Sequence, residues 1–158
     1  MADELWSDHE FRMRTAIRQA KMAAEAEEVP IGAAIYHQGH LIAQAHNQVE
    51  TLKDPTAHAE ILAITQAATA LGDWRLTDTV LYVTKEPCPM CAGAIVLARI
   101  PLVVWGMTDP KRGGAISEFK ILQSTALNHR PDVVTGILEG ECSEIVKTFF
   151  KNRREEPT

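Results

Sequence analysis

The chain has 158 residues, of which 46% are hydrophobic and 23% are charged, and its net charge is −5. This size fits one compact domain, residues 1–158, and the charge gives no overall sign of a protein that binds polyanions. Three cysteines make a disulfide framework unexpected, and no stretch is long or apolar enough to cross a membrane. Because the first residues also lack the basic start of a signal peptide, we expect a cytoplasmic protein.

The first elements that the sequence predicts are a helix and a β-hairpin. Residues 8–26 are rich in helix formers, and their apolar side chains recur at helical spacing. Residues 31–36 and 41–46 have the character of strands, and the turn-like residues between them join the two strands into a hairpin. The helix face that we expect to be buried comprises Phe11, Ile17, Ala20 and Ala24.

A second helix is predicted to begin at Asp54 and Pro55. Aspartate is a favoured N-cap residue, and proline is favoured in the first turn of a helix. The segment continues through apolar residues to Leu71, and Gly72 is a typical residue for the end of a helix. We therefore expect one continuous helix from Asp54 to Leu71.

The remainder of the chain predicts three more strands and two more helices. Residues 79–84 form the strongest strand in the sequence, and residues 88–99 form the helix that follows it. Residues 102–106 predict another buried strand, residues 131–135 a last short strand, and residues 139–154 a final helix. Helices that alternate with apolar strands indicate a layered α/β domain, in which we expect the later strands to be parallel.

Two short motifs carry the chemistry. The first contains His58 and Glu60, and the second contains Cys88 and Cys91 at the start of a helix, where the helix dipole favours thiolates. Zinc prefers imidazole and thiolate ligands, and three protein ligands leave a fourth position for water, as in catalytic zinc sites. We therefore predict one Zn²⁺ held by His58, Cys88 and Cys91, with Glu60 as the group that carries the proton of the water.

Other interpretations of the cysteine pair stay open. A redox pair would act as a dithiol and would leave His58 and Glu60 without a role. A structural zinc site would need a fourth ligand, which Cys142 or another histidine could supply. The complete pattern H-x-E followed by P-C-x-x-C is instead typical of the zinc-dependent nucleobase deaminases, which replace an amino group by a carbonyl and release ammonia.

The chain resembles the bacterial tRNA-specific adenosine deaminases of the cytidine deaminase-like superfamily, from about residue 11 to residue 154. This resemblance implies a three-layer α/β/α fold around a central mixed five-stranded sheet, and it implies a homodimer. It also implies the conversion of the wobble adenosine in a tRNA anticodon stem-loop to inosine, with the base flipped into the zinc pocket. Besides the two zinc motifs, it rests on Val29-Pro30-Ile31-Gly32-Ala33, His46-Asn47, Leu81-Tyr82-Val83-Thr84, Asn128-His129-Arg130 and Phe149-Phe150.

The resemblance also assigns residues that would contact the substrate. Asn47 would hydrogen-bond the base or ribose, unless it serves only as a turn residue after the hairpin. Asp109 would contact a flanking nucleotide, unless it belongs to a solvated turn, and Asn128 would face the substrate, unless it is a cap. The basic and aromatic end of the last helix would meet phosphates and stack on a base, unless it is simply solvated. The predicted substrate-binding residues are Asn47, Ala59, Asp109, Lys111, Asn128, Phe150 and Arg153.

Two departures from the family pattern bear on the substrate. Lys85 stands where the family usually has an apolar residue, and residues 111–117 differ from the family's usual glycine-alanine loop. One alternative is therefore a deaminase of a free base or nucleotide (guanine, cytosine or deoxycytidylate), which would need a closed pocket over its small ligand. A second alternative is a non-catalytic binding subunit with the zinc fold. Such subunits commonly lose the glutamate, whereas Glu60 is present.

Overall fold

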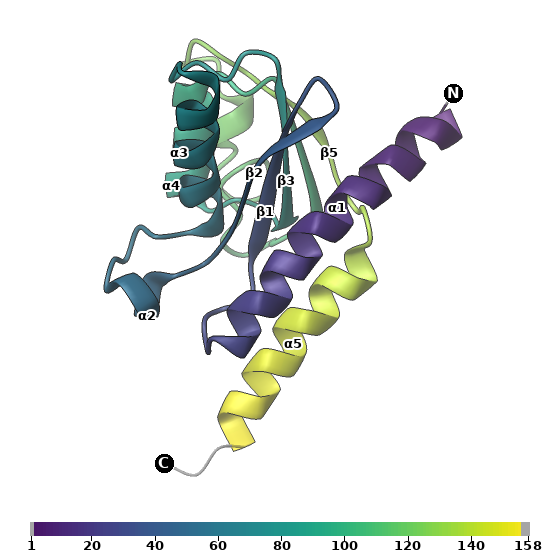
Figure 1. Cartoon of the computed structure of the whole chain (residues 1–158), viewed down its shortest axis with the longest axis vertical. Helices are drawn as coiled ribbons and strands as arrows, with labels where there is room; N and C mark the ends of the chain where they lie inside the picture. The colour runs from purple at the N-terminus through teal and green to yellow at the C-terminus, as the bar shows by residue number, and fades with distance from the viewer. Residues whose placement is uncertain (1, 156–158) are drawn as a thin grey trace.

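The computed structural model describes the backbone of residues 2–155 and the side chains of residues 6–155. Five strands form one sheet in the order β2-β1-β3-β4-β5 (Figure 1). The first three strands in this order pair antiparallel and the last three pair parallel, so the sheet is mixed, as expected. The strands are β1 (Gly32–His37), β2 (His40–His46), β3 (Thr79–Lys85), β4 (Leu102–Met107) and β5 (Asp132–Val134).

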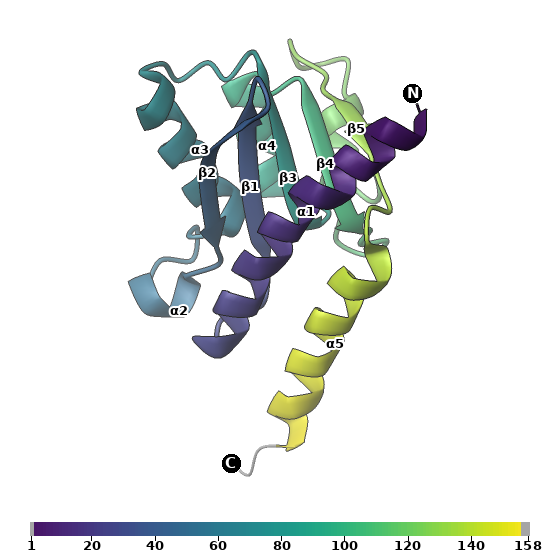
Figure 2. The same ribbon diagram turned by 45° about the vertical axis from the view of Figure 1, so that its right-hand side comes forward.

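Helices cover both faces of the sheet, which confirms the α/β/α layering (Figures 1 and 2). On one face α1 and α5 lie side by side and run in the same direction, and on the other face lie α3 and α4. None of these helices, within the described residues, is long and apolar enough to cross a membrane. The helices are α1 (Ala2–Glu25), α2 (Val49–Leu52), α3 (Ala59–Leu71), α4 (Pro89–Ala98) and α5 (Glu139–Glu155), and a short 3₁₀ turn spans Ile121–Gln123.

Strand residues alternate between two apolar cores, because successive side chains of a strand point to opposite faces of the sheet. On β3, Leu81 and Val83 pack in the core beneath α3 and α4. Tyr82, which lies between them in the sequence, packs against α1 on the other face. The strands are thus buried on both sides, and their carboxyl ends become the place where side chains can meet a ligand.

The predicted buried face of α1 is wrong at Phe11, and Ala24 is only partly buried. Phe11 is 75% exposed, whereas Met13, Ala16 and Ile17 are buried. At about 100° per residue, Phe11 lies about 120° around the helix from Ile17, so the two side chains cannot share a face. The helix also begins earlier than predicted, at Ala2.

The predicted start of the second helix is also wrong, and the difference matters for the site. The carboxylate of Asp54 accepts hydrogen bonds from the N–H and the hydroxyl of Thr56, at 2.8 and 2.7 Å, and so closes a turn instead of capping a helix. The helix α3 begins only at Ala59, with His58 in an extended conformation at its N-cap. An additional short helix, α2, precedes this turn and was not predicted.

Candidate active site

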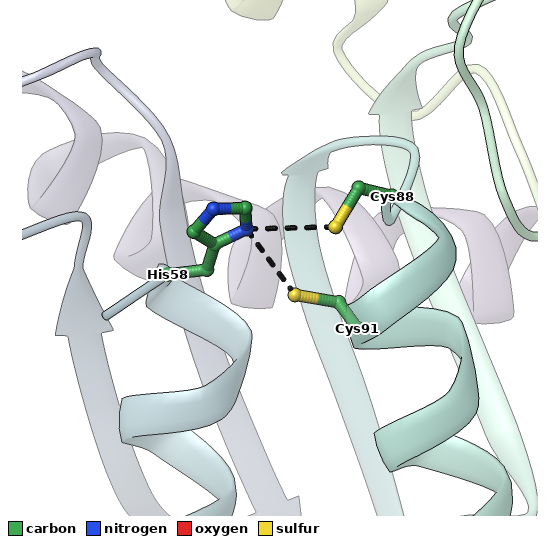
Figure 3. A group of neighbouring side chains, drawn as sticks. All are labelled: His58, Cys88 and Cys91. Carbon is green, nitrogen blue, oxygen red and sulfur yellow. Dashed lines mark hydrogen bonds between the residues drawn. The ribbon is translucent and has the colours of Figure 1, made fainter. Parts of the chain in front are cut away.

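His58, Cys88 and Cys91 converge between the starts of α3 and α4 (Figure 3). The Nδ1 atom of His58 lies 3.5 Å from the Sγ atom of each cysteine, and all three ligand atoms lie within 4.8 Å of one another. A tetrahedral zinc ion with ordinary bond lengths separates its nitrogen and sulfur ligands by about 3.5 Å. The three side chains therefore fit one zinc ion.

The two cysteines differ in how strongly they hold a proton. A hydrogen bond from the Cys91 thiol, opposed by burial and assisted by His58, lowers the pKa of Cys88 to about 4. The same hydrogen bond, together with burial, raises the pKa of Cys91. A divalent cation would favour the thiolate form of both residues, which is the form that binds zinc. Cys142 cannot serve as a fourth ligand here, because it packs in the core beneath α1 and α5.

Glu60 lies beside this group and is buried. It occupies the first turn of α3, and only 4% of the residue is exposed. Burial raises the pKa of Glu60 to about 7, against smaller opposing contributions from its own backbone N–H and from nearby polar groups. A carboxyl group with such a pKa suits a role in proton transfer near neutral pH.

A cavity of about 330 Å³ opens over these residues. His58, Ala59, Glu60 and Cys88 line it from the starts of α3 and α4, and these residues are called the floor below. Its walls come from the segment between α1 and β1, from α2, and from the segments that follow β3 and β4. The volume lies at the lower end of the range for small-molecule sites, about 300–1,000 Å³.

Comparison with known proteins identifies the family. The family model of the MafB19-like deaminases matches residues 7–154. The tRNA-specific adenosine deaminase of Bacillus subtilis (strain 168) is 50% identical over 145 residues, which cover 92% of this chain and 90% of that protein. The chain belongs to the tRNA-specific adenosine deaminases.

Solved structures agree with this assignment. A structure from a study of A-to-I editing by tRNA:A34 deaminases at the wobble position of transfer RNA has a TM-score of 0.83 and 44% identity. That similarity covers 85% of this chain and 98% of the other chain. A guanine deaminase from Bacillus subtilis has a TM-score of 0.61 and 42% identity, over 63% of this chain and 64% of the other chain. The comparisons therefore confirm the resemblance, the fold and the deaminase class, and they show that a guanine deaminase shares part of the sequence.

The structure brings four of the predicted substrate-binding residues to the cavity. Asn47, Ala59, Asp109 and Arg153 all line it. Asn47 is also a turn residue, because its amide donates to the Val29 carbonyl at 3.3 Å and accepts from a backbone N–H at 3.2 Å. Both interpretations of Asn47 are thus compatible with its position.

The other three predicted substrate-binding residues lie outside the cavity. Lys111 is exposed in the loop that follows β4, and Phe150 is exposed on α5. Asn128 precedes β5, and the neighbouring His129 ring lies 2.7 Å from the carbonyl of Ile100, just before β4. These contacts place Asn128 at the amino ends of the parallel strands, whereas the cavity lies at their carboxyl ends. Contact of Asn128 with a base in this cavity therefore has no support from the geometry of a single chain.

Two buried glutamates shape the cavity walls, and the sequence analysis assigned neither of them a role. The carboxylate of Glu28 accepts hydrogen bonds from the N–H groups of Glu50 and Thr51, at 3.0 and 2.7 Å, and so caps α2. Burial alone would raise the pKa of Glu28, but these bonds, with one from the Thr51 hydroxyl, lower it. No local signal could have revealed this cap, because its partners lie 22 and 23 residues away along the chain.

Glu86 holds the opposite wall in the same manner. Its carboxylate accepts hydrogen bonds from the N–H groups of Asp109, Ile116 and Ser117, at 3.0 to 3.1 Å, and from the Ser117 hydroxyl. A side chain at Gly113 would collide with this carboxylate, so glycine is required for the close approach. The only sequence signal for Glu86 is its place directly before the cysteine motif.

Proposed function

We propose that this protein removes the amino group of the wobble adenosine in a tRNA anticodon stem-loop by hydrolysis, which leaves inosine and releases ammonia. The observation that carries this function is the group of His58, Cys88 and Cys91 beside the buried Glu60 in the cavity. The relatives support the substrate, since the Bacillus subtilis protein of 50% identity is a tRNA-specific adenosine deaminase.

His58, Cys88 and Cys91 would hold one Zn²⁺ per subunit, and the bound ion would supply the acidity that makes water a nucleophile near neutral pH. Glu60 takes a proton from the water that attacks the amino-bearing carbon of the adenine, and it delivers this proton to the adjacent ring nitrogen. Glu60 then takes the remaining proton from the added hydroxyl group and gives it to the departing amine, so that the carbon–nitrogen bond breaks, ammonia leaves and a carbonyl remains. A single carboxylate can serve both transfers because Glu60 lies in the first turn of α3, next to the ligand His58.

Residues of the walls would position the substrate. Asn47 in the wall and Ala59 on the floor line the cavity and would contact the base, while Asp109 and Arg153 also line it and would contact the flanking nucleotides. Lys111 lies in the same loop as Asp109, after β4. Phe150 lies one helical turn before Arg153 on α5. Their charge and aromatic ring suit phosphate contact and base stacking outside the cavity.

We further propose a homodimer located in the cytoplasm. Met90 and Leu97 lie two helical turns apart on the outer face of α4, where they are 36% and 69% exposed. Phe119, in the loop beside α4, is 58% exposed. An exposed apolar helix face of this kind suits a self-complementary interface with a second copy. Light scattering on the purified protein gives the mass in solution, and a monomer at micromolar concentration would contradict this part of the proposal.

A side-by-side assay tests the substrate. The protein is incubated with an adenosine-containing anticodon stem-loop, free guanine, cytosine and deoxycytidylate, and products are detected by the mass change from amine to carbonyl. We expect inosine in the stem-loop and no turnover of the free base or nucleotide. The matched control is the Glu60→Gln protein, which should keep the fold and leave all four compounds unchanged.

A deaminase of free guanine is the second candidate, because a guanine deaminase shares 42% identity over part of the chain. Two observations favour the tRNA substrate over it. The tRNA-specific relative matches 92% of this chain, against 63% for the guanine deaminase. In addition, of the described residues of α5 only Arg153 lines the cavity, so this helix flanks the cavity instead of closing it. Turnover of guanine without turnover of the stem-loop would contradict the proposed substrate and leave the deamination chemistry in place.

A further inference from the structure

The wall of the cavity contains a lysine that the proposed mechanism does not use. Lys85 is the last residue of β3, and its ammonium lies 3.3 Å from the carboxylate of Asp109. Both side chains line the cavity, and they are 30% and 17% exposed. The ion pair is therefore largely withdrawn from solvent, in the wall of the cavity.

The charged residues around the cavity are mostly acidic, so the positive charge of Lys85 matters for the binding of a polyanion. Among the residues that the structure describes, six acidic residues and three residues with a permanent positive charge line the cavity. Such a surface repels the phosphates of an incoming nucleic acid unless cations meet them. The acidic residues are Glu27, Glu28, Glu50, Glu60, Glu86 and Asp109, and the cationic ones are Lys85, Arg112 and Arg153.

Lys85 differs from the two arginines in how it is held. Arg153 donates to the backbone carbonyl of Glu27 at 3.0 Å, and its guanidinium lies over the ring of Phe149. Arg112 is exposed on the loop after β4. The ammonium of Lys85 has three N–H donors, and Asp109 can occupy one of them, which leaves donors for a ligand in the cavity.

We propose that Lys85 is a substrate-positioning residue, whose ammonium donates to a phosphate oxygen of the RNA backbone next to the adenosine in the cavity. Asp109 holds the ammonium in place, and Asp109 is itself fixed by hydrogen bonds from the N–H groups of Lys111 and Arg112, at 3.2 and 3.1 Å. The donor is thus oriented before the substrate arrives, which reduces the entropy lost on binding. This inference rests on the proposed tRNA substrate.

A purely structural role for the ion pair, as a tie that holds the loop after β4, is less consistent with the contacts. Glu86 already fixes this loop through its hydrogen bonds to Asp109, Ile116 and Ser117. The turn at Asp109 is closed by backbone N–H groups, without Lys85. The loop therefore keeps these hydrogen bonds when Lys85 is replaced by a neutral residue.

Steady-state kinetics on the anticodon stem-loop, at several salt concentrations from about 50 to about 200 mM, test the role of Lys85. For Lys85→Met we expect KM to rise about tenfold at the lowest salt, while kcat stays within about twofold of the wild type. The slope of log(kcat/KM) against log[salt] should become shallower by about one, because one phosphate contact is lost. Lys85→Arg should restore the slope.

Arg75→Met is the matched control, because it removes the same charge from an exposed residue near the amino end of β3, far from the cavity. It should leave the slope and KM unchanged. Lys85→Gln provides a second neutral side chain in case the methionine variant does not fold, which thermal unfolding of each protein reveals.

A wild-type salt slope in both neutral variants would overturn the inference, whatever happens to kcat. A fall in kcat or in thermal stability without a change of slope would assign Lys85 to the structural tie and would also overturn it. If the wild-type protein converts free guanine and not the stem-loop, the proposed function itself fails, and the two failures are thereby distinguished.

Discussion

The floor and the walls of the cavity both contain buried glutamates, but the two regions hold them in opposite ways. On the floor, burial raises the pKa of Glu60 to about 7. In the walls, Glu28 and Glu86 each accept several hydrogen bonds, mostly from backbone N–H groups, and these bonds lower the pKa of Glu28 despite its burial. The hydrogen bonds to Glu28 thus favour its ionised form, whereas the burial of Glu60 favours its protonated form.

We therefore assign the reaction to the floor residues and the shape of the cavity to the wall residues. The floor residues lie at the starts of two helices, and the core beneath them would persist without their side chains. The wall residues instead connect segments that have no regular pairing of their own, namely α2 and the loop after β4. Substitutions on the floor should therefore remove activity and preserve the fold of the sheet, whereas substitutions in the walls should alter stability and substrate binding first.

Loss of a metal ligand should have the largest effect. For His58→Ala we expect the bound zinc to fall from about one ion per chain to below about a tenth of that, with loss of deamination and a lower melting temperature. Elemental analysis of the purified protein, together with the assay on the stem-loop, measures both. His40→Ala, at an exposed position of the β-hairpin, is the matched control and should retain zinc and activity. Full activity of His58→Ala after removal of metal by a chelator would contradict the assignment of the ligands.

Glu60→Gln should produce nearly as large a loss of activity without a loss of metal. We expect kcat to fall by about 10³-fold, within the range for removal of a group that transfers protons, with zinc content and melting temperature close to those of the wild type. The amide has nearly the same size as the carboxyl group, so the buried site should keep its packing. Turnover that survives this change would show that Glu60 is not the proton carrier.

The sequence predicted the floor far better than the walls, and the reason lies in the range of the interactions. His58, Glu60, Cys88 and Cys91 form two short motifs, each at the start of a helix, and these local patterns suffice to indicate a metal site with an acidic residue beside it. The continuous apolar runs of β3 and β4 likewise predicted buried strands, since that pattern is local. Glu28 could not be recognised, because its hydrogen-bond partners are distant in the sequence.

The helix start at Asp54 was predicted wrongly for a related reason, because the local pattern fits two structures. An aspartate before a proline satisfies the rules for an N-cap, but the same side chain can also bond the backbone two residues ahead in a tight turn. In this chain Asp54 forms the turn with Thr56, and α3 begins only after this turn, at Ala59 in the core. Similarly, Asn128 belongs to a motif of the family, yet the parallel pairing of β4 and β5 places it at the far end of the sheet from the cavity.

Glu86→Gln tests the wall after β4. The amide keeps one oxygen acceptor and replaces the other by an NH₂ group, so some of the buried donors of Asp109, Ile116 and Ser117 lose their partner. We expect a loss of about 2–3 kcal/mol in the free energy of unfolding, and a rise in KM that exceeds the fall in kcat. Urea unfolding and steady-state kinetics measure the two effects. Glu118→Gln, in an exposed part of the same loop, should leave both unchanged, and an equal fall in kcat with constant KM would assign Glu86 to the chemistry instead.

Glu28→Gln should have the smallest effect, and its dependence on pH should identify the cause. Loss of the ionised cap of α2 should reduce the free energy of unfolding by about 1 kcal/mol at pH 7. The pKa of Glu28 is lower in the folded chain than in the unfolded chain, where it is about 4.3. The ionised carboxylate therefore stabilises the fold above about pH 4.3, and this contribution disappears as the pH falls toward the folded-state pKa.

The difference in the free energy of unfolding between wild type and Glu28→Gln should thus shrink in acid. Glu27→Gln, at the exposed neighbouring position, should not differ from the wild type at either pH. Because the acid response of the remaining groups is common to both proteins, a difference that stays constant with pH would mean that packing, and not the ionised cap, holds this wall of the cavity.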